Sequence, residues 1–257
     1  MISIIVATLK RPTYAALVQS IRMQDFDDYE LIARYDPDVN EYISRNRAAK
    51  QASGDYLFFT DDDCVLPRGF LRALHEDLER GNRPAGLTGP VNVYNTAGVT
   101  RIDQPTWGIG ANMTVRSDCF HAVGGFEETW GLPYPVKGWR ADTALWWSLE
   151  DAYPGQLKHS PRLVIEHRNP MQSEWVPEIE EIFFRRWRKK VLERLVPVDP
   201  RLQEFLLQTQ QLSAEETDFI IRCRRELRKK VNGIPVLEVE KGKQYELDSI
   251  EQRAAQA

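Results

Sequence analysis

The first hundred residues alternate between two kinds of segment, and this alternation limits the possible folds more than any other feature. Short apolar runs rich in β-branched and aromatic residues predict buried strands, and a segment with apolar residues at helical spacing follows each of them. Such alternation favours parallel pairing with helices on both faces of a sheet, so the sequence predicts an α/β fold with a mostly parallel central sheet. The expected strands are residues 3–8, 29–35 and 56–60, and the expected helices are residues 12–23, 41–52 and 67–81.

Three consecutive aspartates, Asp61, Asp62 and Asp63, follow the last of these strands. Ligands of open α/β sheets bind at the carboxyl ends of the strands. Carboxylates placed there repel one another unless a cation joins them, and their hard oxygen atoms suit Mg²⁺ or Mn²⁺. An acidic turn that caps the following helix is the alternative interpretation.

The composition is that of a globular protein, since 42% of the residues are hydrophobic and 28% are charged. A chain of 257 residues has room for one large domain, or for one domain and a helical appendage. A net charge of −4 gives no general reason to expect nucleic-acid binding. The three cysteines are widely spaced and form no CxxC pair, which argues against a disulfide framework or a thiolate zinc site. No segment approaches the roughly 20 apolar residues of a membrane span. The sequence therefore predicts a cytoplasmic protein.

The pattern changes after about residue 84, where glycine, proline and tryptophan become frequent. An irregular region of this kind beside a rigid sheet is a plausible place for a site. The expected elements are strands at residues 87–94, 112–116 and 163–166 and a helix at residues 141–149.

Residues 177–232 are expected to be helical and highly charged. Apolar residues between positions 179 and 195 form one helix stripe. Ser213 and Glu216 have the spacing of a capping box that opens a last helix. A basic run at residues 185–190 has three interpretations, namely a solvated helix face, attachment to an anionic membrane surface, and contact with an anionic substrate.

Five ordered motifs in the first 170 residues resemble those of the inverting glycosyltransferases of the GT-A fold, family 2. They are residues 4–12, 45–48, 56–63, 110–116 with 123–126 following, and 141–146. The resemblance implies a Rossmann-like GT-A fold with a C-terminal helical extension. The implied division is a glycosyltransferase domain at 1–175, comprising a nucleotide-sugar half at 1–100 and an acceptor half at 101–175, then an extension at 176–232 and a tail at 233–257.

The same resemblance implies which residues bind the donor. Asp63 is the expected metal ligand, and Asp61 faces the ribose or donor sugar. Asp62 alternates away from both along an extended chain, so a surface or capping role is favoured, although it stays among the candidate donor-binding residues. The other candidates are Thr8 and Arg11 near the nucleotide, Asp36 at the base (or else a turn residue), and Arg45 at the base or phosphates (or else a solvated helix arginine).

Asp142 is the expected general base, because an attacking hydroxyl loses its proton to a carboxylate within hydrogen-bond reach. An ordinary helix N-cap is the alternative. The family's neighbouring acids are replaced by Ala141 and Ala144, so Asp142 stands alone. His167, late in the domain, is expected to join the metal or the diphosphate, as imidazole is an acceptable Mn²⁺ ligand.

These expectations together describe a metal-assisted glycosyltransferase that uses Mn²⁺ or Mg²⁺. The implied donor is a nucleoside-diphosphate sugar, UDP- or GDP-linked, and the acceptor is a saccharide, a lipid-linked molecule or a small molecule. A catalytically inactive nucleotide-sugar-binding module is the first alternative. A metal-dependent nucleotidyltransferase is the second, although residues 7–11 lack the glycine-rich phosphate loop that such enzymes carry.

Overall fold

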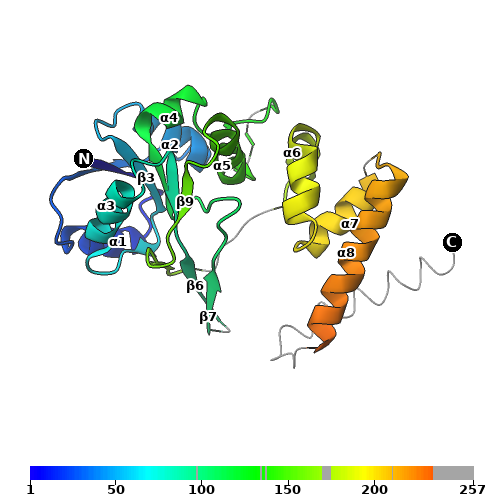
Figure 1. Cartoon of the computed structure of the whole chain (residues 1–257). Coiled ribbons are helices and arrows are strands. Elements are labelled where there is room, and N and C mark those ends of the chain that lie inside the picture. Colours follow the sequence, from blue (N-terminus) through cyan, green and yellow to red (C-terminus); the bar gives the residue numbers. More distant parts are fainter. Residues whose placement is uncertain (97, 134, 137, 170–174, 210, 234–257) are drawn as a thin grey trace. The chain divides into compact units, whose positions relative to one another are not determined.

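The structure is a computed structural model that describes residues 1–96, 98–133, 135–136, 138–169, 175–209 and 211–233 (Figure 1). The chain divides between Phe183 and Phe184 into two compact units. No helix in the described part of the chain combines the length and apolar character needed to cross a membrane. The domain boundary expected at residue 175 stays a prediction.

Among the described residues of the first unit, six strands form one sheet in which a single strand is antiparallel to its neighbours. That strand is β8, which lies between β3 and β5, whereas β1 pairs in parallel with both β2 and β3. This arrangement confirms the predicted α/β fold with a mostly parallel sheet. The strands, in spatial order, are β2 (Tyr29–Arg34), β1 (Ile2–Ala7), β3 (Tyr56–Asp61), β8 (Met113–Arg116), β5 (Gly86–Thr88) and β9 (Leu157–His159).

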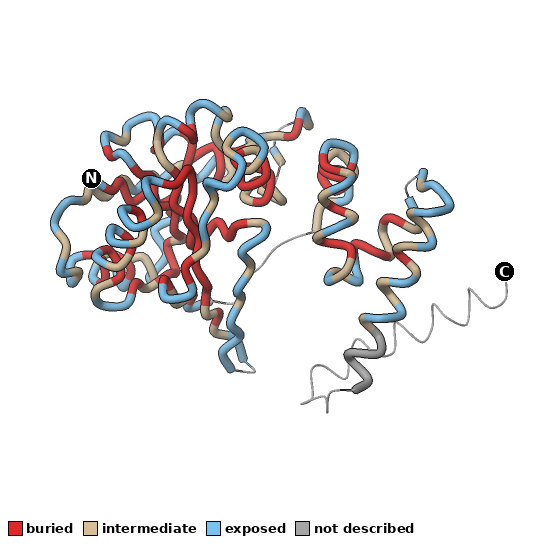
Figure 2. The backbone as a smooth tube through the Cα atoms, viewed as in Figure 1, coloured by how far each residue is buried: buried red, intermediate tan, exposed pale blue. Residues whose placement is uncertain are grey.

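Helices cover both faces of this sheet (Figure 1). On one face, Ile4 and Phe58 of the strands share a buried cluster with Leu17 of α1 and Leu74 of α3. On the other face, the ring of Phe59 packs 5.2 Å from that of Phe120 in α4. Buried residues consequently run along the strands (Figure 2). The helices are α1 (Thr13–Arg22), α2 (Glu41–Ala49), α3 (Phe70–Arg80), α4 (Ser117–Ala122) and α5 (Ala141–Ala152).

A second, four-stranded sheet adjoins the carboxyl end of β3. Its order is β4 (Cys64–Val65), β10 (Ile165–His167), β6 (Val91–Asn95) and β7 (Gly98–Ile102). The single strand expected at residues 87–94 is therefore two strands in two sheets, β5 and β6. The break falls at Gly89, where a Cβ atom would lie only 2.2 Å from the carbonyl oxygen of Leu163, and at Pro90, which has no N–H to donate.

Helices α6 (Pro177–Lys190), α7 (Pro200–Thr209) and α8 (Ala214–Gly233) and a π-helical segment (Val191–Leu195) form the C-terminal part of the chain. The predicted capping box is present, because Glu216 N–H donates to Ser213 Oγ at 3.2 Å and Ser213 N–H donates to Glu216 Oε2 at 2.8 Å. Arg188 of the basic run donates to both carboxylate oxygens of Glu216 at 2.6 Å. One member of that run is therefore structural, and the three interpretations of the rest stay open.

Candidate functional site

A cavity of about 900 Å³ opens at the carboxyl ends of β1, β2 and β3 and reaches the start of α5. This is the edge of the sheet where ligands of α/β proteins bind. All the candidate residues named from the sequence line this cavity, although they come from distant parts of the chain. They are Thr8, Arg11, Asp36, Arg45, Asp61, Asp62, Asp63, Asp142 and His167. Their individual roles stay predictions.

The aspartate triplet lies where the chain crosses from one sheet to the other. Asp61 ends β3, the chain turns through Asp62 and Asp63, and Cys64 begins β4. His167 of β10 pairs directly opposite Cys64. The Nε2 atom of His167 consequently lies 3.5 Å from Asp61 Oδ2 and 3.2 Å from Asp63 Oδ1.

Local contacts fix the orientation of the His167 ring. Its Nδ1 atom lies 2.6 Å from the carbonyl oxygen of Asn169, so Nδ1 carries the donated proton and Nε2 faces the carboxylates. The side-chain amide of Asn169 also donates to Asp63 Oδ2 at 3.1 Å. A metal-ligating histidine held by a backbone carbonyl in this way is typical of protein metal sites.

The charges in this cluster shift one another's pKa values. Burial raises the pKa of Asp63 above its usual value, against the opposing effect of His167. Burial acts the same way on Asp61, but Arg45 and His167 outweigh it and lower the pKa of that carboxyl. Burial lowers the pKa of His167, whereas its interactions with Asp61 and Asp63 outweigh burial and leave the pKa raised.

The donor set fits a divalent cation. Potential ligand atoms of Asp61, Asp63, Cys64 and His167 all lie within 4.8 Å of one another. Asp63 is 5% exposed, and its Oδ1 atom accepts no hydrogen bond from any residue that the structure describes. Buried polar oxygens normally have a partner. The two carboxylates suit Mn²⁺ or Mg²⁺, and the imidazole is an acceptable further ligand for Mn²⁺.

Asp62 is not a surface carboxylate, and that expectation was wrong. Its side chain is buried and accepts hydrogen bonds from Thr8 Oγ1 at 2.9 Å and from the Leu9 N–H at 3.1 Å. Arg11 Nη1 lies 3.6 Å from Asp62 Oδ1. The alternation argument failed because the chain turns immediately after Asp61 instead of continuing as an extended strand. Asp62 thus ties the loop after β1 to the aspartate turn.

Arg45 is not a solvated helix arginine. Its side chain is 3% exposed and forms an ion pair with Asp61. The guanidinium carbon also lies 5.4 Å from the centre of the Tyr42 ring and 5.8 Å from that of the Phe126 ring. Aromatic faces attract cations at such distances. The arginine therefore forms part of the cavity floor.

Asp36 follows β2 and lines the same cavity, but other side chains already contact its carboxylate. Arg34 donates to it through Nε at 2.9 Å and Nη2 at 3.1 Å, and Ser44 Oγ donates at 3.0 Å. These interactions, led by the Arg34 hydrogen bond, lower the pKa of Asp36 despite burial. Asp36 is accordingly ionised at neutral pH, and its contact with a base stays a prediction.

Asp142 is the second residue of α5. Its carboxylate accepts from the Thr143 N–H at 2.7 Å and from the Gly110 N–H at 3.2 Å. Burial raises the pKa of Asp142 in spite of these two hydrogen bonds. A Cβ atom on Gly110 would lie 2.9 Å from Arg45 Nη1 and 3.4 Å from Asp142 Cβ, so a side chain there would displace the Arg45 guanidinium. Asp142 thus combines a helix-start hydrogen bond with a position in the cavity wall.

A strained residue precedes α5. Arg140 has a φ of 58°, in the left-handed region that side chains disfavour. Its Nε donates to the buried carboxylate of Glu180 at 2.8 Å, and Trp139 Nε1 donates to the same Glu180 oxygen at 2.7 Å. These anchors hold the loop that leads into Asp142.

Several residues of the site were missed from the sequence. Asn169 could have been found, because it follows His167 by two positions and residues so spaced share one side of an extended chain. Gly110 lies within a recognised motif, but its role as a donor to Asp142 depends on tertiary contact. No sequence pattern indicated that Glu180, in a helix far along the chain, would anchor Trp139 and Arg140.

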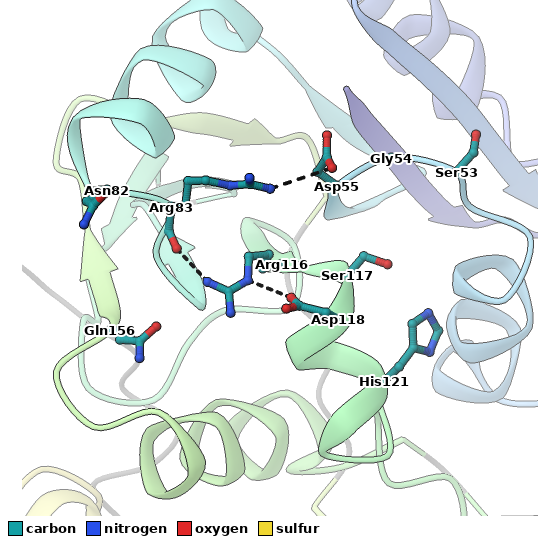
Figure 3. A pocket seen from close by; sticks show the side chains of 10 residues that line it. All are labelled: Ser53, Gly54, Asp55, Asn82, Arg83, Arg116, Ser117, Asp118, His121 and Gln156. Atoms are coloured by element: carbon teal, nitrogen blue, oxygen red, sulfur yellow. Dashed lines mark hydrogen bonds and ion pairs between the residues drawn. The ribbon is translucent and has the colours of Figure 1, made fainter.

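A second hollow, of about 740 Å³, lies at the amino ends of β3, β5 and β9 (Figure 3). Its basic side chains contact acidic ones, since Arg83 lies 3.8 Å from Asp55 and Arg116 lies 2.7 Å from Asp118. Arg116 also donates to the Arg83 carbonyl oxygen at 2.8 Å. Arg83 and Arg116 are thus held in ion pairs with neighbouring aspartates.

Comparison with known proteins agrees with this geometry. Residues 38–140 match the family model described as Glycosyl transferase family 2. The solved structure of S. aureus TarS 1-349 is 13% identical, with a TM-score of 0.55, over 95% of this chain and 76% of that one. The same protein in complex with UDP-GlcNAc gives a TM-score of 0.55 at 13% identity, over 95% and 77% of the two chains. No curated protein matches the sequence at a significant level.

The similarity to TarS also has a limit in length. A further crystal structure of S. aureus TarS matches at 13% identity with a TM-score of 0.54. This match covers 95% of this chain but only 46% of that one. Likeness at this identity shows the fold. The family match identifies residues 38–140 as part of a glycosyltransferase family 2 domain, and the likeness to TarS agrees with a fold of the GT-A type.

Proposed function

We propose that the protein transfers a sugar from a nucleoside-diphosphate sugar to an acceptor hydroxyl, with inversion at the anomeric carbon. One observation carries this proposal. A single cavity holds the Asp61, Asp63 and His167 cluster together with Asp142, a carboxylate with a raised pKa. The complex of distantly similar TarS with UDP-GlcNAc supports a UDP-linked donor.

Asp63 and His167 would hold the divalent cation, with Asp61 beside them. When bound, Mn²⁺ or Mg²⁺ stabilises the negative charge that develops on the departing diphosphate. Asn169 keeps His167 and Asp63 in position through hydrogen bonds to both. Arg11, whose side chain is 52% exposed and whose Nη1 lies 3.8 Å from Asp63 Oδ2, is free to turn toward a phosphate at the cavity mouth.

The nucleotide would lie against the loops after β1 and β2. Thr8 donates a hydrogen bond to Asp62, and this contact shapes the loop after β1. Asp36 lies in the loop after β2. Arg45 neutralises Asp61 from below, which keeps that carboxylate ionised and able to accept hydrogen bonds from sugar hydroxyls. The donor site is therefore preorganised before substrate arrives.

Asp142 would act as the general base. The acceptor oxygen forms a bond to the anomeric carbon while the bond from that carbon to the diphosphate breaks, and the acceptor proton passes to Asp142. A raised pKa makes this carboxylate a stronger base than an ordinary aspartate. Hydrogen bonds from Gly110 and Thr143 fix its orientation. The acceptor class stays a prediction, namely a saccharide, a lipid-linked molecule or a small molecule.

The test is a screen of nucleoside-diphosphate sugars with Mn²⁺, first for thermal stabilisation and then for release of the nucleoside diphosphate. Selective binding of one donor raises the melting temperature. Release of diphosphate that depends on both metal and Asp142 would support the proposal. Binding without any release, across acceptors of all three classes, would contradict it.

A further inference from the structure

Cys64 contributes nothing to the transfer steps above, yet its thiol lies within the metal-ligating cluster. We propose that Cys64 is a fourth ligand for thiophilic divalent cations such as Zn²⁺ and Co²⁺, which bind through Asp61, Asp63, His167 and Cys64 together. This inference rests on the proposed metal site. It adds a second coordination mode to that site, with a sulfur donor that Mn²⁺ and Mg²⁺ do not require.

The backbone places the sulfur beside the other ligands. Cys64 begins β4 and pairs in antiparallel register with His167 of β10. Directly opposed residues of an antiparallel pair project to the same face of the sheet. The Cys64 thiol and the His167 imidazole are therefore neighbours, and their ligand atoms lie within 4.8 Å of those of Asp61 and Asp63.

The burial of the site supports a bound ion over an acidic surface patch. Cys64 is fully buried, and His167 and Asp63 are each 5% exposed. The Oδ1 atom of Asp63 is buried without a hydrogen bond from any described residue, although its Oδ2 atom accepts from Asn169. The atom that lacks a hydrogen bond is the one that faces His167, at 3.2 Å. This second observation points to a cation in the same space.

The four donors suit a borderline or soft cation. Two carboxylates, one imidazole and one thiolate make a four-coordinate set of the kind that Zn²⁺ accepts. Zn²⁺ and Co²⁺ bind nitrogen and sulfur sites more tightly than Mn²⁺ does. On binding, the sulfur–metal bond forms while the thiol proton is released to solvent. A cation held by four protein ligands has no open position for a diphosphate, so Zn²⁺ is expected to inhibit transfer.

The alternative is that Cys64 is only a small apolar residue in the core, as many buried cysteines are. Spectroscopy separates the two cases without an activity assay. Co²⁺ stands in for Zn²⁺ and reports a thiolate ligand through a sulfur-to-cobalt charge-transfer band in the near ultraviolet. The experiment titrates Co²⁺ into the metal-free full-length chain, and calorimetry with Mn²⁺ and Co²⁺ follows binding independently.

We expect the charge-transfer band in the wild type and its loss in Cys64→Ser and Cys64→Ala, both of which still bind Mn²⁺. Asp63→Asn should lose the band with Cys64 intact, so the result does not depend on how well the Cys64 variants fold. Cys119→Ser and Cys223→Ser are the matched controls and should keep the band.

Co²⁺ binding without the band, or a band that survives in both Cys64 variants, overturns the role of Cys64 and leaves the Asp61, Asp63 and His167 site standing. A wild-type chain that binds neither Co²⁺ nor Mn²⁺ overturns the metal site itself. The failure of the further inference is thus distinguishable from the failure of the proposed function.

Discussion

Arg45 and Asp61 form an ion pair in which the arginine is buried in the cavity floor and the aspartate ends β3. Removing Arg45 takes a buried charge-assisted contact from Asp61, which is 33% exposed and keeps His167 at 3.5 Å. Arg45→Met should therefore lower the free energy of unfolding by about 1.5–3 kcal/mol, the contribution of a hydrogen bond between charged groups. Urea denaturation followed by circular dichroism measures this change.

Arg47→Met is the matched control for this variant. Arg47 lies two residues further along α2, its side chain is 47% exposed, and its Nη1 atom lies 3.7 Å from Asp36 Oδ2. Exposed pairs contribute about 0–1 kcal/mol, so this variant should unfold almost as the wild type does. Equal losses in the two variants would show that the burial of Arg45 contributes nothing special to stability.

Asp142→Asn should lower kcat by about 10²–10⁴-fold, the usual contribution of a general base. Binding of nucleotide and Mn²⁺ should not change, because Asp142 is not among the proposed metal ligands or donor-binding residues. Asp151→Asn, on an exposed position of the same helix, is the control.

The raised pKa of Asp142 also predicts how the wild-type kcat depends on pH. Only the ionised carboxylate is a base. As the pH is lowered, wild-type kcat should therefore begin to fall at a higher pH than it would with an aspartate of ordinary pKa. Retained kcat in Asp142→Asn would remove it from the mechanism.

Much of the fold was predictable because its local signals agree with tertiary packing. The strand ending at Asp61 is apolar on both faces, and the helix after it has a clear apolar stripe, so the parallel sheet follows from the sequence. The break at Gly89 did not, because it depends on the close approach of Leu163, which lies far along the chain. The short strands β7 and β9 were missed for a similar reason, as their residues have no strong pattern of their own.

The membership of the site was more predictable than its contacts. Motif order identified the residues that line the cavity, but the exposure of Asp62 and Arg45 was judged from general tendencies. Carboxylates and arginines are usually solvated. Only the tertiary structure shows that Asp62 and Arg45 are both buried, the first with Thr8 and the second with Asp61 as its partner. Cysteine spacing argued against a disulfide framework or a thiolate zinc site. It could not show that one cysteine lies opposite His167 in a different strand.

Asp62 and Asp63 should separate in their effects, although they are adjacent in the chain. Asp63→Asn removes a proposed ligand and should weaken Mn²⁺ binding by at least about 10–100-fold. Asp62→Asn leaves the ligands in place but weakens the hydrogen bonds from Thr8 and Leu9. It should therefore keep its Mn²⁺ affinity and lose about 10-fold in nucleotide affinity. Calorimetry with each ligand measures both effects. The opposite pattern would exchange the roles assigned to the two aspartates.

Glu216 makes a pH-dependent contribution to the stability of the C-terminal helices. Its hydrogen bonds with Arg188 lower its pKa from 4.5 to about 2. A depressed carboxyl pKa stabilises the folded state above pH 4.5, and this contribution disappears as the pH falls to about 2.

Glu216→Gln keeps a capping-box side chain, so it removes only the charge. Because solvent partly screens the ion pair, the variant should lose about 1 kcal/mol of unfolding free energy at neutral pH. Denaturation at several pH values should show this difference shrinking between pH 4.5 and about 2. Glu215→Gln, at an exposed neighbouring position, should show none, and a difference for Glu216→Gln that is constant with pH would mean that the ion pair is not its source.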